Sequence, residues 1–434
     1  MRLVIVGGVA AGMSAAARAR RLDPSLEIVV LERGAHVAWA ACGLPFYLSG
    51  RVARLDDLIL FTPERFQRER GVLVRTGAEV TAIRPARRQV VLRGGEQISY
   101  DRLILATGAR PRRDIAGAEL PHVFTLHTLE DGRRLRSFLD EQRPRRAGVI
   151  GAGYIGLEIA DALSERGLEV TVWEARPWVL DRQDPELTQL LERRLAERRI
   201  ELRLGTAVSG IEPGSVQGVP AEVVVIAAGL QPNVELAAEA GIELGRFGAI
   251  RVNDRMETNL AGVYAAGDCA ETTHVVTGGP VYLPLGTTAN KMGRVAGANA
   301  AGRRERFGGV AGTLIVALRE LAIAVTGLSV AQARQAGFQP VSVRIEAPDR
   351  SRYLGSRPTW VELVADRNTS RLLGGSVVGE KGVAGRINVV ATALAAGMTL
   401  EQFAQLDLAY TPPLAPVRDP LLVAANELNK VLAS

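Results

Sequence analysis

Cysteine is scarce in this chain of 434 residues, which contains only Cys42 and Cys269. Two cysteines cannot form a disulfide framework, so the sequence predicts a protein of a reducing compartment, and we expect a cytoplasmic location. No uninterrupted apolar run approaches the roughly 18–20 residues that a membrane-spanning helix needs. The apolar run near the N-terminus covers only Leu3 to Val6 before a glycine turn, which is too short for a signal peptide.

Lysine, histidine and aromatic residues are also few. The chain has three lysines against fifty arginines, four histidines and 5% aromatic residues, with a net charge of +6. We expect most of the arginines on a solvated surface, in ion pairs. No basic stripe is interleaved with aromatic residues, and no zinc or helix-turn-helix signature occurs. The sequence therefore predicts no nucleic-acid binding, no membrane association and no metal site.

The first recognisable unit lies at the N-terminus. Residues 3–6 form an apolar run that is typical of a buried parallel strand. A glycine turn follows, then a helix expected over 10–22 and a second strand over 27–32 that ends in Glu32. An acid about twenty residues after the turn is typical of a dinucleotide-binding unit, with an ordinary βαβ unit as the alternative. The glycines of this turn are Gly7, Gly8 and Gly12, and Val9 replaces the middle glycine of the pattern.

A second glycine turn carries the complete G-x-G-x-x-G pattern, at Gly151, Gly153 and Gly156. A strand precedes it, a helix follows it, and the next strand ends in Glu174. We expect phosphates at the helix N-terminus and a ribose hydroxyl at Glu174, which favours NADH because a 2′-phosphate would be repelled. Arg176 lies two residues further on and softens that preference, so NADPH stays an alternative.

Two further strand ends place the second unit inside the first. Residues 104–111 and 260–272 each contain a short strand that runs into a polar glycine turn, at Thr107–Gly108 and Gly267–Asp268. Two separated strand ends of this kind suit a first domain that is interrupted and then resumes. The expected fold class is α/β, with two doubly wound dinucleotide-binding domains and a C-terminal α+β domain of alternating strands and helices.

These segments resemble the flavoprotein disulfide reductases that bind FAD and a nicotinamide cofactor, and the resemblance covers essentially the whole chain. It implies an FAD-binding domain over 1–112 and 246–320, an NAD(P)H-binding domain over 113–245 and a dimerisation domain over 321–434. A homodimer is therefore expected. The resemblance implies FAD contacts at Gly7, Gly8, Gly12, Glu32, Arg33, Val80, Thr107, Gly108, Gly267 and Asp268. It implies NAD(P)H contacts at Gly151, Gly153, Tyr154, Ile155, Gly156, Glu158, Glu174 and Gly229.

Within that superfamily the chain resembles the branch that uses one redox cysteine. It has no C-x-x-x-x-C pair and no histidine in its C-terminal third. The branch contains coenzyme A disulfide reductases, persulfide and polysulfide reductases, NADH oxidases and NADH peroxidases. Oxidase and peroxidase relatives carry a histidine in the first glycine turn, where this chain has Ala10. Five segments resemble those of the coenzyme A disulfide reductase group, namely GGVAAGMSAA, CGLPFYLSG, GDCAETTHVVTG, PLGTTANKMGRVAGANAAG and YTPPLAPVRDP. Ala38 and Ala41 depart from it, since that group often has Ser and Asn there.

The resemblance implies that Cys42 cycles through a mixed disulfide with a small thiol, with coenzyme A as substrate or bound partner. Tyr410 and Tyr353 are the implied proton donors, and in related enzymes such tyrosines come from the other subunit. Tyr154 resembles a tyrosine that shields the flavin, and Glu158 resembles a carboxylate near the nicotinamide. Cys269 is expected to be a packing residue near FAD. Coenzyme A contacts are expected at Arg18, Arg21, Asn299 and Arg303, with a surface or helix-end role as the alternative.

Three functions stay open from the sequence. Reduction of coenzyme A disulfide by NAD(P)H is the first. A persulfide or polysulfide reductase, or an NADH oxidase, using the same cysteine is the second. A redox-sensing flavoprotein with little turnover is the third, and rapid NADH consumption with a disulfide would exclude it.

Overall fold

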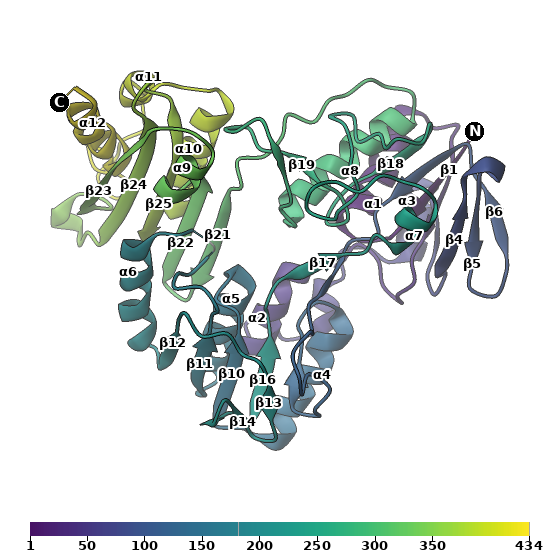
Figure 1. Cartoon of the computed structure of the whole chain (residues 1–434), viewed down its shortest axis with the longest axis horizontal. Coiled ribbons are helices and arrows are strands. Elements are labelled where there is room, and N and C mark those ends of the chain that lie inside the picture. The colour runs from purple at the N-terminus through teal and green to yellow at the C-terminus, as the bar shows by residue number, and fades with distance from the viewer. Residues whose placement is uncertain (181, 434) are drawn as a thin grey trace.

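The computed structural model describes residues 1–180 and 182–433 and arranges them in three lobes (Figure 1). The first lobe holds the N-terminus and a parallel five-stranded sheet in the order β18-β7-β1-β2-β3. These strands are β1 (Arg2–Val6), β2 (Glu27–Leu31), β3 (Leu73–Arg75), β7 (Arg102–Leu105) and β18 (Val263–Ala265). Because β18 comes from far along the chain and pairs with β7, the first lobe is interrupted and resumes, as the sequence predicts.

Helices and a small antiparallel sheet surround this first sheet. The helices are α1 (Ala10–Leu22), α3 (Pro63–Arg70), α7 (Glu235–Glu239) and α8 (Gly286–Ala300), with the 3₁₀ turn η3 (Pro85–Arg87). The segment that carries the 3₁₀ turn η1 (Ala41–Gly43), the helix α2 (Leu44–Ser49) and the 3₁₀ turn η2 (Leu55–Leu58) leaves this lobe and packs on the second lobe. The small sheet contains β4 (Val80–Arg84), β5 (Gln89–Leu92) and β6 (Gln97–Ser99). Two short pairs complete the lobe, β8 (Ala109–Pro111) with β17 (Leu230–Pro232) and β19 (Thr272–Thr273) with β20 (Pro280–Val281).

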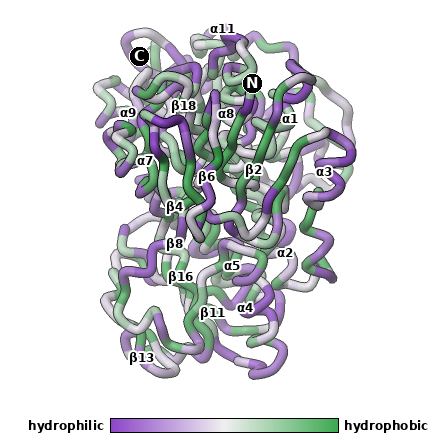
Figure 2. The backbone as a smooth tube through the Cα atoms, turned by 90° about the vertical axis from the view of Figure 1, so that its right-hand side faces the viewer, coloured by the Kyte–Doolittle hydropathy of each residue, from purple (hydrophilic) through white to green (hydrophobic). Residues whose placement is uncertain are grey.

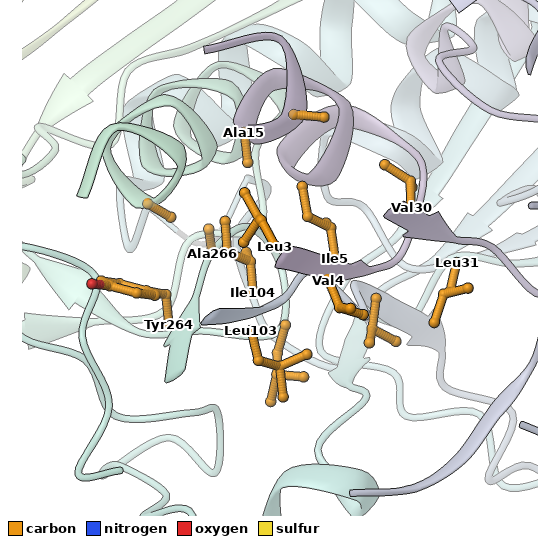
Figure 3. Close-up of a cluster of buried hydrophobic side chains, with 14 of the residues drawn as sticks. Leu3, Val4, Ile5, Ala15, Val30, Leu31, Leu103, Ile104, Tyr264 and Ala266 are labelled. Carbon is orange, nitrogen blue, oxygen red and sulfur yellow. The ribbon is translucent and has the colours of Figure 1, made fainter. Parts of the chain in front are cut away.

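The core of the first lobe explains why these segments fold together. Leu3, Ile5, Leu103 and Ile104 are fully buried in the core around this sheet (Figure 3). The helices α1 and α8 pack so closely that a Cβ at Gly293 would lie 2.2 Å from the carbonyl oxygen of Ala11 on α1. Close packing of small residues therefore fixes α8 against the helix that follows the first glycine turn.

The second lobe repeats the same plan within the interruption of the first. Its parallel sheet has the order β12-β11-β10-β16-β9. The strands are β9 (Val123–Phe124), β10 (Arg146–Ile150), β11 (Glu169–Trp173), β12 (Ile200–Arg203) and β16 (Val223–Ile226). Helices α4 (Leu129–Gln142), α5 (Tyr154–Glu165) and α6 (Pro185–Ala196) cover it, and β13 (Ile211–Glu212), β14 (Ser215–Val216) and β15 (Val219–Pro220) form a small sheet. Figure 2 shows hydrophobic segments along the inner strands of both parallel sheets and hydrophilic segments in the surrounding loops.

The third lobe is an antiparallel sheet covered by helices, with the strand order β21-β22-β25-β24-β23. The strands are β21 (Leu314–Leu318), β22 (Leu321–Gly327), β23 (Pro340–Pro348), β24 (Pro358–Asp366) and β25 (Leu372–Gly379). The helical elements are α9 (Val330–Gln335), η4 (Arg352–Leu354), α10 (Val383–Ala395), α11 (Leu400–Ala404) and α12 (Pro420–Ala433). The hairpin of β21 and β22 crosses the predicted domain boundary at residue 320, so the hydrogen bonds of this sheet begin earlier than that boundary. The domain limits themselves stay a prediction.

No helix among the described residues is long and apolar enough to cross a membrane.

Candidate active site

The first glycine turn joins β1 to α1 and is held by the backbone of its neighbours. Gly7 has φ +107°, and a Cβ there would lie 2.1 Å from the carbonyl oxygen of Ala106, so only glycine fits. The Glu32 carboxylate accepts hydrogen bonds from the backbone N–H groups of Gly8 and Gly34, both at 2.7 Å. The acid at the end of β2 is thus fixed beside the N-terminus of α1, where a dinucleotide ribose would lie.

The second glycine turn, between β10 and α5, repeats this arrangement. Gly151 has φ +112°, and a Cβ there would lie 2.3 Å from the carbonyl oxygen of Ala227. The Glu174 carboxylate accepts from the backbone N–H groups of Ala152 at 2.9 Å and Arg176 at 3.0 Å. A Cβ at Gly153, the middle position of the pattern, would meet no protein atom within 4 Å, and Val9 lies at the corresponding position of the first turn.

Asp268 follows β18, and the surroundings of its carboxylate show whether the first lobe fits FAD. Burial raises the pKa of its carboxyl to about 6. No group among the described residues donates a hydrogen bond to this carboxylate, whereas its backbone carbonyl accepts one from the Tyr282 hydroxyl at 2.9 Å. A desolvated carboxylate without a donor, at the carboxyl end of the sheet, fits a ligand that brings hydroxyl groups. The residues of this lobe therefore fit FAD.

The remaining predicted cofactor contacts lie around the same strand ends. The Thr107 hydroxyl donates to the carbonyl of Asn233 at 2.7 Å, which ties the end of β7 to the chain returning from the second lobe. Gly108 has φ +66° and Gly229 has φ +102°, and a Cβ at either would meet no atom within 4 Å. Val80 is buried at the start of β4, and Arg33 is exposed after Glu32. Gly12 and Gly156 lie in the first turn of their helices, and Ile155 is partly buried in α5. Gly267 is buried beside Asp268.

Cys42 lies where the first two lobes meet. The backbone N–H of Ala38 donates to the carbonyl of Gly8 at 2.9 Å, which ties the segment before the cysteine to the first glycine turn. After the cysteine, α2 packs on α4 and α5 of the second lobe, with Leu44 and Leu48 in that lobe's core (Figure 1). The residue itself is exposed in the 3₁₀ turn η1. One end of this short segment is thus fixed by each dinucleotide-binding lobe.

The charges around Cys42 act against ionisation of its thiol. Although Cys42 is exposed, the surrounding protein partly desolvates its thiol, and this desolvation is the largest cause of its raised pKa. The negative charges of Glu158 and Asp268 raise this pKa further. The backbone N–H of the cysteine acts in the opposite direction, with a smaller effect. Burial also raises the pKa of Glu158 to about 7, so its own charge changes near neutral pH. The protein side chains alone therefore keep the thiol protonated.

Tyr154 links the second lobe to the first by a hydrogen bond. It is the first residue of α5, and its hydroxyl donates to the carbonyl of Pro284 in the first lobe at 3.0 Å. Burial raises the pKa of this tyrosine, and the charges of Asp268, Cys42 and Glu158 raise it further. Cys42, Tyr154, Glu158 and Asp268 come from three separate parts of the chain, and the structure thus brings them close enough for the charges of the group to affect the pKa values of Tyr154 and Cys42.

Tyr282 also lies beside these residues, and the sequence did not predict it as a site residue. It lies between β20 and α8, its hydroxyl donates to the backbone of Asp268, and burial together with the charge of Asp268 raises its pKa. No pattern in the sequence indicates this contact, because it depends on how the chain folds between residues 268 and 282.

Tyr353 and Tyr410 are not brought to Cys42 within one chain. They lie in the third lobe, on η4 and on the segment before α12, where they are 77% and 49% exposed. Figure 1 shows this lobe on the opposite side of the molecule from the sheet of the first lobe. The role of these two tyrosines at Cys42, with the other subunit as their source, stays a prediction.

The predicted coenzyme A contacts lie near the ends of α1 and α8. Arg18 pairs with Glu305, and Arg21 and Arg303 are exposed. Asn299 is 5% exposed, and its side-chain amide bonds the backbone of Arg255 and Glu305, which favours the helix-end alternative for this residue. Two exposed cations on α8, Lys291 and Arg294, were not predicted, although their spacing of three residues places them on one helix face.

The other cysteine is a core residue. Cys269 is fully buried directly after Asp268, and its thiol contacts the carbonyl oxygens of Leu105 and Ala266, both at 3.5 Å. No group of three or more His, Cys, Asp and Glu residues that could hold a metal ion occurs in the described part of the chain.

Known proteins resemble this chain in two parts, over the nucleotide-binding lobes and over the third lobe. Residues 1–302 match the pyridine nucleotide-disulphide oxidoreductase family, and residues 314–420 match the dimerisation domain of that family. The chain is 39% identical to an NAD(P)H coenzyme A polysulfide/persulfide reductase of Pyrococcus horikoshii, over 99% of this chain and 98% of the relative. It is 29% identical to a coenzyme A disulfide reductase of Staphylococcus haemolyticus, over 96% and 97%. The structure of an NAD-dependent persulfide reductase from A. fulgidus superposes with a TM-score of 0.96 at 39% identity, covering 99% of this chain and 83% of that one.

The fold and the two nucleotide turns thus define a two-dinucleotide flavoprotein oxidoreductase. The chain belongs to the pyridine nucleotide-disulphide oxidoreductase family, in the group that contains coenzyme A disulfide reductases and persulfide reductases. This family implies FAD and NAD(P)H as cofactors, and its dimerisation domain implies a homodimer.

Proposed function

We propose that the chain reduces sulfur–sulfur bonds with NAD(P)H through Cys42 alone, and that coenzyme A disulfide is its first candidate substrate. One observation carries this proposal: the exposed thiol lies between the two nucleotide-binding lobes, while Cys269 is buried in the core. Two cysteines so placed do not suit an internal redox disulfide. The second sulfur must therefore come from the substrate.

The residues that would hold the cofactors follow from the two turns. Gly7, Glu32 and Asp268 suit FAD, and Gly151 and Glu174 suit the nicotinamide dinucleotide. When bound, FAD carries two electrons from NAD(P)H to sulfur. Because Glu174 is anionic and fixed by two backbone N–H groups, we expect NADH to be preferred over NADPH.

The chemistry of Cys42 follows from disulfide exchange. The Cys42 thiolate attacks one sulfur of coenzyme A disulfide, the sulfur–sulfur bond breaks, and one coenzyme A thiolate leaves and takes a proton. The product is a mixed disulfide between Cys42 and coenzyme A. Two electrons from NAD(P)H then break that bond, which releases the second coenzyme A thiolate and restores the Cys42 thiolate. One NAD(P)H and one proton are used for two thiols.

The leaving thiolates need a proton donor, and the chain has no histidine in its C-terminal third. Tyr353 and Tyr410 are the proposed donors, contributed by the third lobe of a second subunit. Their high exposure in one chain supports this arrangement, because a tyrosine hydroxyl must reach the leaving sulfur directly or through water.

The adenine-nucleotide part of coenzyme A carries phosphates, and cations on α1 and α8 are the proposed contacts. Arg21, Lys291 and Arg294 are exposed on these two packed helices, and Arg303 is exposed shortly after the end of α8. Arginine binds phosphate oxygens in a bidentate manner, which suits a terminal phosphate group.

A second candidate, reduction of a coenzyme A-linked persulfide or polysulfide, is favoured by the 39% identity to the relative from Pyrococcus horikoshii. The chemistry at Cys42 would be the same attack on a sulfur–sulfur bond. Ala38 and Ala41, where coenzyme A disulfide reductases often have polar residues, are consistent with this second candidate.

The test is NADH oxidation by the FAD-loaded enzyme without oxygen, with coenzyme A disulfide, coenzyme A persulfide or glutathione disulfide as acceptor. We expect kcat/KM for coenzyme A disulfide to exceed that for glutathione disulfide by about tenfold or more. R21A should raise KM for coenzyme A disulfide about threefold at unchanged kcat, whereas R87A, which removes another exposed arginine, should not. Turnover with the persulfide alone would establish the second candidate. NADH oxidation only in a separate assay, with oxygen as the acceptor, would contradict both candidates.

A further inference from the structure

Two short segments of the third lobe expose apolar side chains. The first carries η4 with Tyr353, which is 77% exposed. The second precedes α12 and exposes Tyr410 at 49%, Leu414 at 76% and Val417 at 72%. Large apolar side chains that are exposed together indicate a surface that contacts another molecule. Residues 314–420, which match the family's dimerisation domain, include both segments, so the partner that this surface fits is a second copy of the chain.

One buried guanidinium, that of Arg386 on α10, connects these two segments. Arg386 is only 6% exposed. Its Nε donates to the carboxylate of Asp419, at 3.1 Å and 3.4 Å from the two oxygens. Its Nη2 donates to the backbone carbonyl of Asp349 at 3.0 Å. Asp419 ends the segment that carries Tyr410, and Asp349 begins the segment that carries Tyr353.

Further hydrogen bonds make each segment depend on these two aspartates. The Asp349 carboxylate accepts from the backbone N–H of Arg357 at 2.8 Å, which closes the segment around Tyr353. The Asp419 carboxylate accepts from the backbone N–H of Leu421 at 2.9 Å, at the start of α12. The two segments also meet directly, because the backbone N–H of Ser351 donates to the carbonyl of Pro412 at 3.3 Å.

We propose that Arg386 is a positioning residue for the disulfide-reducing step. It holds the segments of Tyr353 and Tyr410 in one fixed arrangement, so that both hydroxyls enter the Cys42 site of the partner subunit together. Only a planar, forked donor can reach a carboxylate and a carbonyl on different segments at once. The inference rests on the proposed function, in particular on the two tyrosines as proton donors, and it adds the residue that orients them.

The test compares R386M with R371M in the FAD-loaded enzyme. Arg371 is a matched control, since its guanidinium also bonds backbone carbonyls of a distant segment, those of Val275 and Val276 between β19 and β20, but contacts neither tyrosine segment. For R386M we expect a dimer by light scattering, and a rate of FAD reduction by NADH within about twofold of the wild type. The kcat for coenzyme A disulfide should fall by about tenfold or more. R371M should keep its kcat within about twofold.

A double-mutant cycle separates positioning from a general structural role. In a Y353F/Y410F background, R386M should lower kcat by less than about twofold, because the groups that it orients are already absent. A full tenfold loss in that background would overturn the proposal. Equal losses in FAD reduction and disulfide reduction would overturn it as well.

A second variant covers the case in which R386M does not give a folded dimer. R386K keeps the charge next to Asp419 but cannot bond the Asp349 carbonyl at the same time, so kcat should fall by about threefold with FAD reduction unchanged. A monomeric R386K would overturn the proposal, since Arg386 would then support assembly rather than orientation. Failure of the proposed function is distinguishable: in that case C42S still reduces coenzyme A disulfide, or Y353F/Y410F has normal kcat.

Discussion

The two cysteines of the chain lie in different surroundings, one exposed between two lobes and one buried in the core of the first lobe. Desolvation by the surrounding protein is the largest cause of a raised pKa at both thiols, even though Cys42 is exposed. The charge of Asp268 raises the pKa of both thiols, whereas the charge of Glu158 acts on Cys42 and the Cys269 thiol contacts backbone carbonyl oxygens of the core. Access and neighbouring charge, rather than residue type, therefore distinguish a reactive cysteine from a packing one.

The surroundings of Cys42 also show what the protein does not supply. The helix α2 begins two residues after the cysteine and is only six residues long. The net effect of the protein groups is a raised pKa. Activation of the thiol therefore depends on what binds between the lobes, and the loss of bound cofactor should make Cys42 less reactive.

The largest difference between the two cysteines should appear in catalysis. C42S should lower kcat for coenzyme A disulfide by about a thousandfold or more, because a hydroxyl cannot form the mixed disulfide. C269S keeps Cys42 and should retain kcat within about threefold. Steady-state NADH oxidation measures both variants, and the absorbance of bound FAD checks that each is loaded. Normal disulfide reduction by C42S would contradict the proposed function.

A second contrast should appear in chemical labelling. After reduction with a thiol reagent, iodoacetamide should alkylate Cys42 at least about a hundredfold faster than Cys269 in the folded protein, since only Cys42 is exposed. Peptide mass spectrometry over time gives both rates. In urea the two rates should become equal, and equal rates in the folded protein would show that Cys269 is accessible.

The sequence predicted most of the fold because its signals are local. The glycine turns, the acids at Glu32 and Glu174 and the alternating strands of the third lobe lie where the patterns indicate. The hairpin of β21 and β22 was missed because two apolar runs are joined without glycine or proline, and Arg319 takes φ +53° at the turn. Neither the nearness of Glu158 to Cys42 nor that of Tyr282 to Asp268 was predictable, since each depends on the packing of segments distant in sequence.

A smaller contrast should appear in stability. C269A should lower the free energy of unfolding by about 1–2 kcal/mol, because it leaves a small cavity in the core around β7 and β18. C42A removes an exposed side chain and should change this free energy by less than about 0.5 kcal/mol. Urea unfolding of both variants, with FAD at the same saturating concentration, makes the comparison. A larger loss for C42A than for C269A would reverse the assignment of the two cysteines.

The smallest expected effect concerns the charge that distinguishes the surroundings of Cys42. Above pH 7 the Glu158 carboxylate is charged and raises the pKa of the thiol, so E158Q should lower that pKa and speed alkylation of Cys42 at pH 8 about threefold. Below pH 6 Glu158 is mostly protonated in the wild type, and the difference should vanish. E165Q, on the exposed side of the same helix, is the control and should leave the rate unchanged. Slower alkylation of E158Q at pH 8 would contradict the sign of this interaction.

The most direct test of the account is the intact mass of the purified protein before and after a reducing agent, with the modified peptide mapped. The account predicts an adduct of the mass of coenzyme A on Cys42, removed by reduction, and no adduct on Cys269. A bare, oxygenated or persulfidated Cys42 would contradict the mixed disulfide with coenzyme A, and would favour the oxidase or the persulfide reductase in its place.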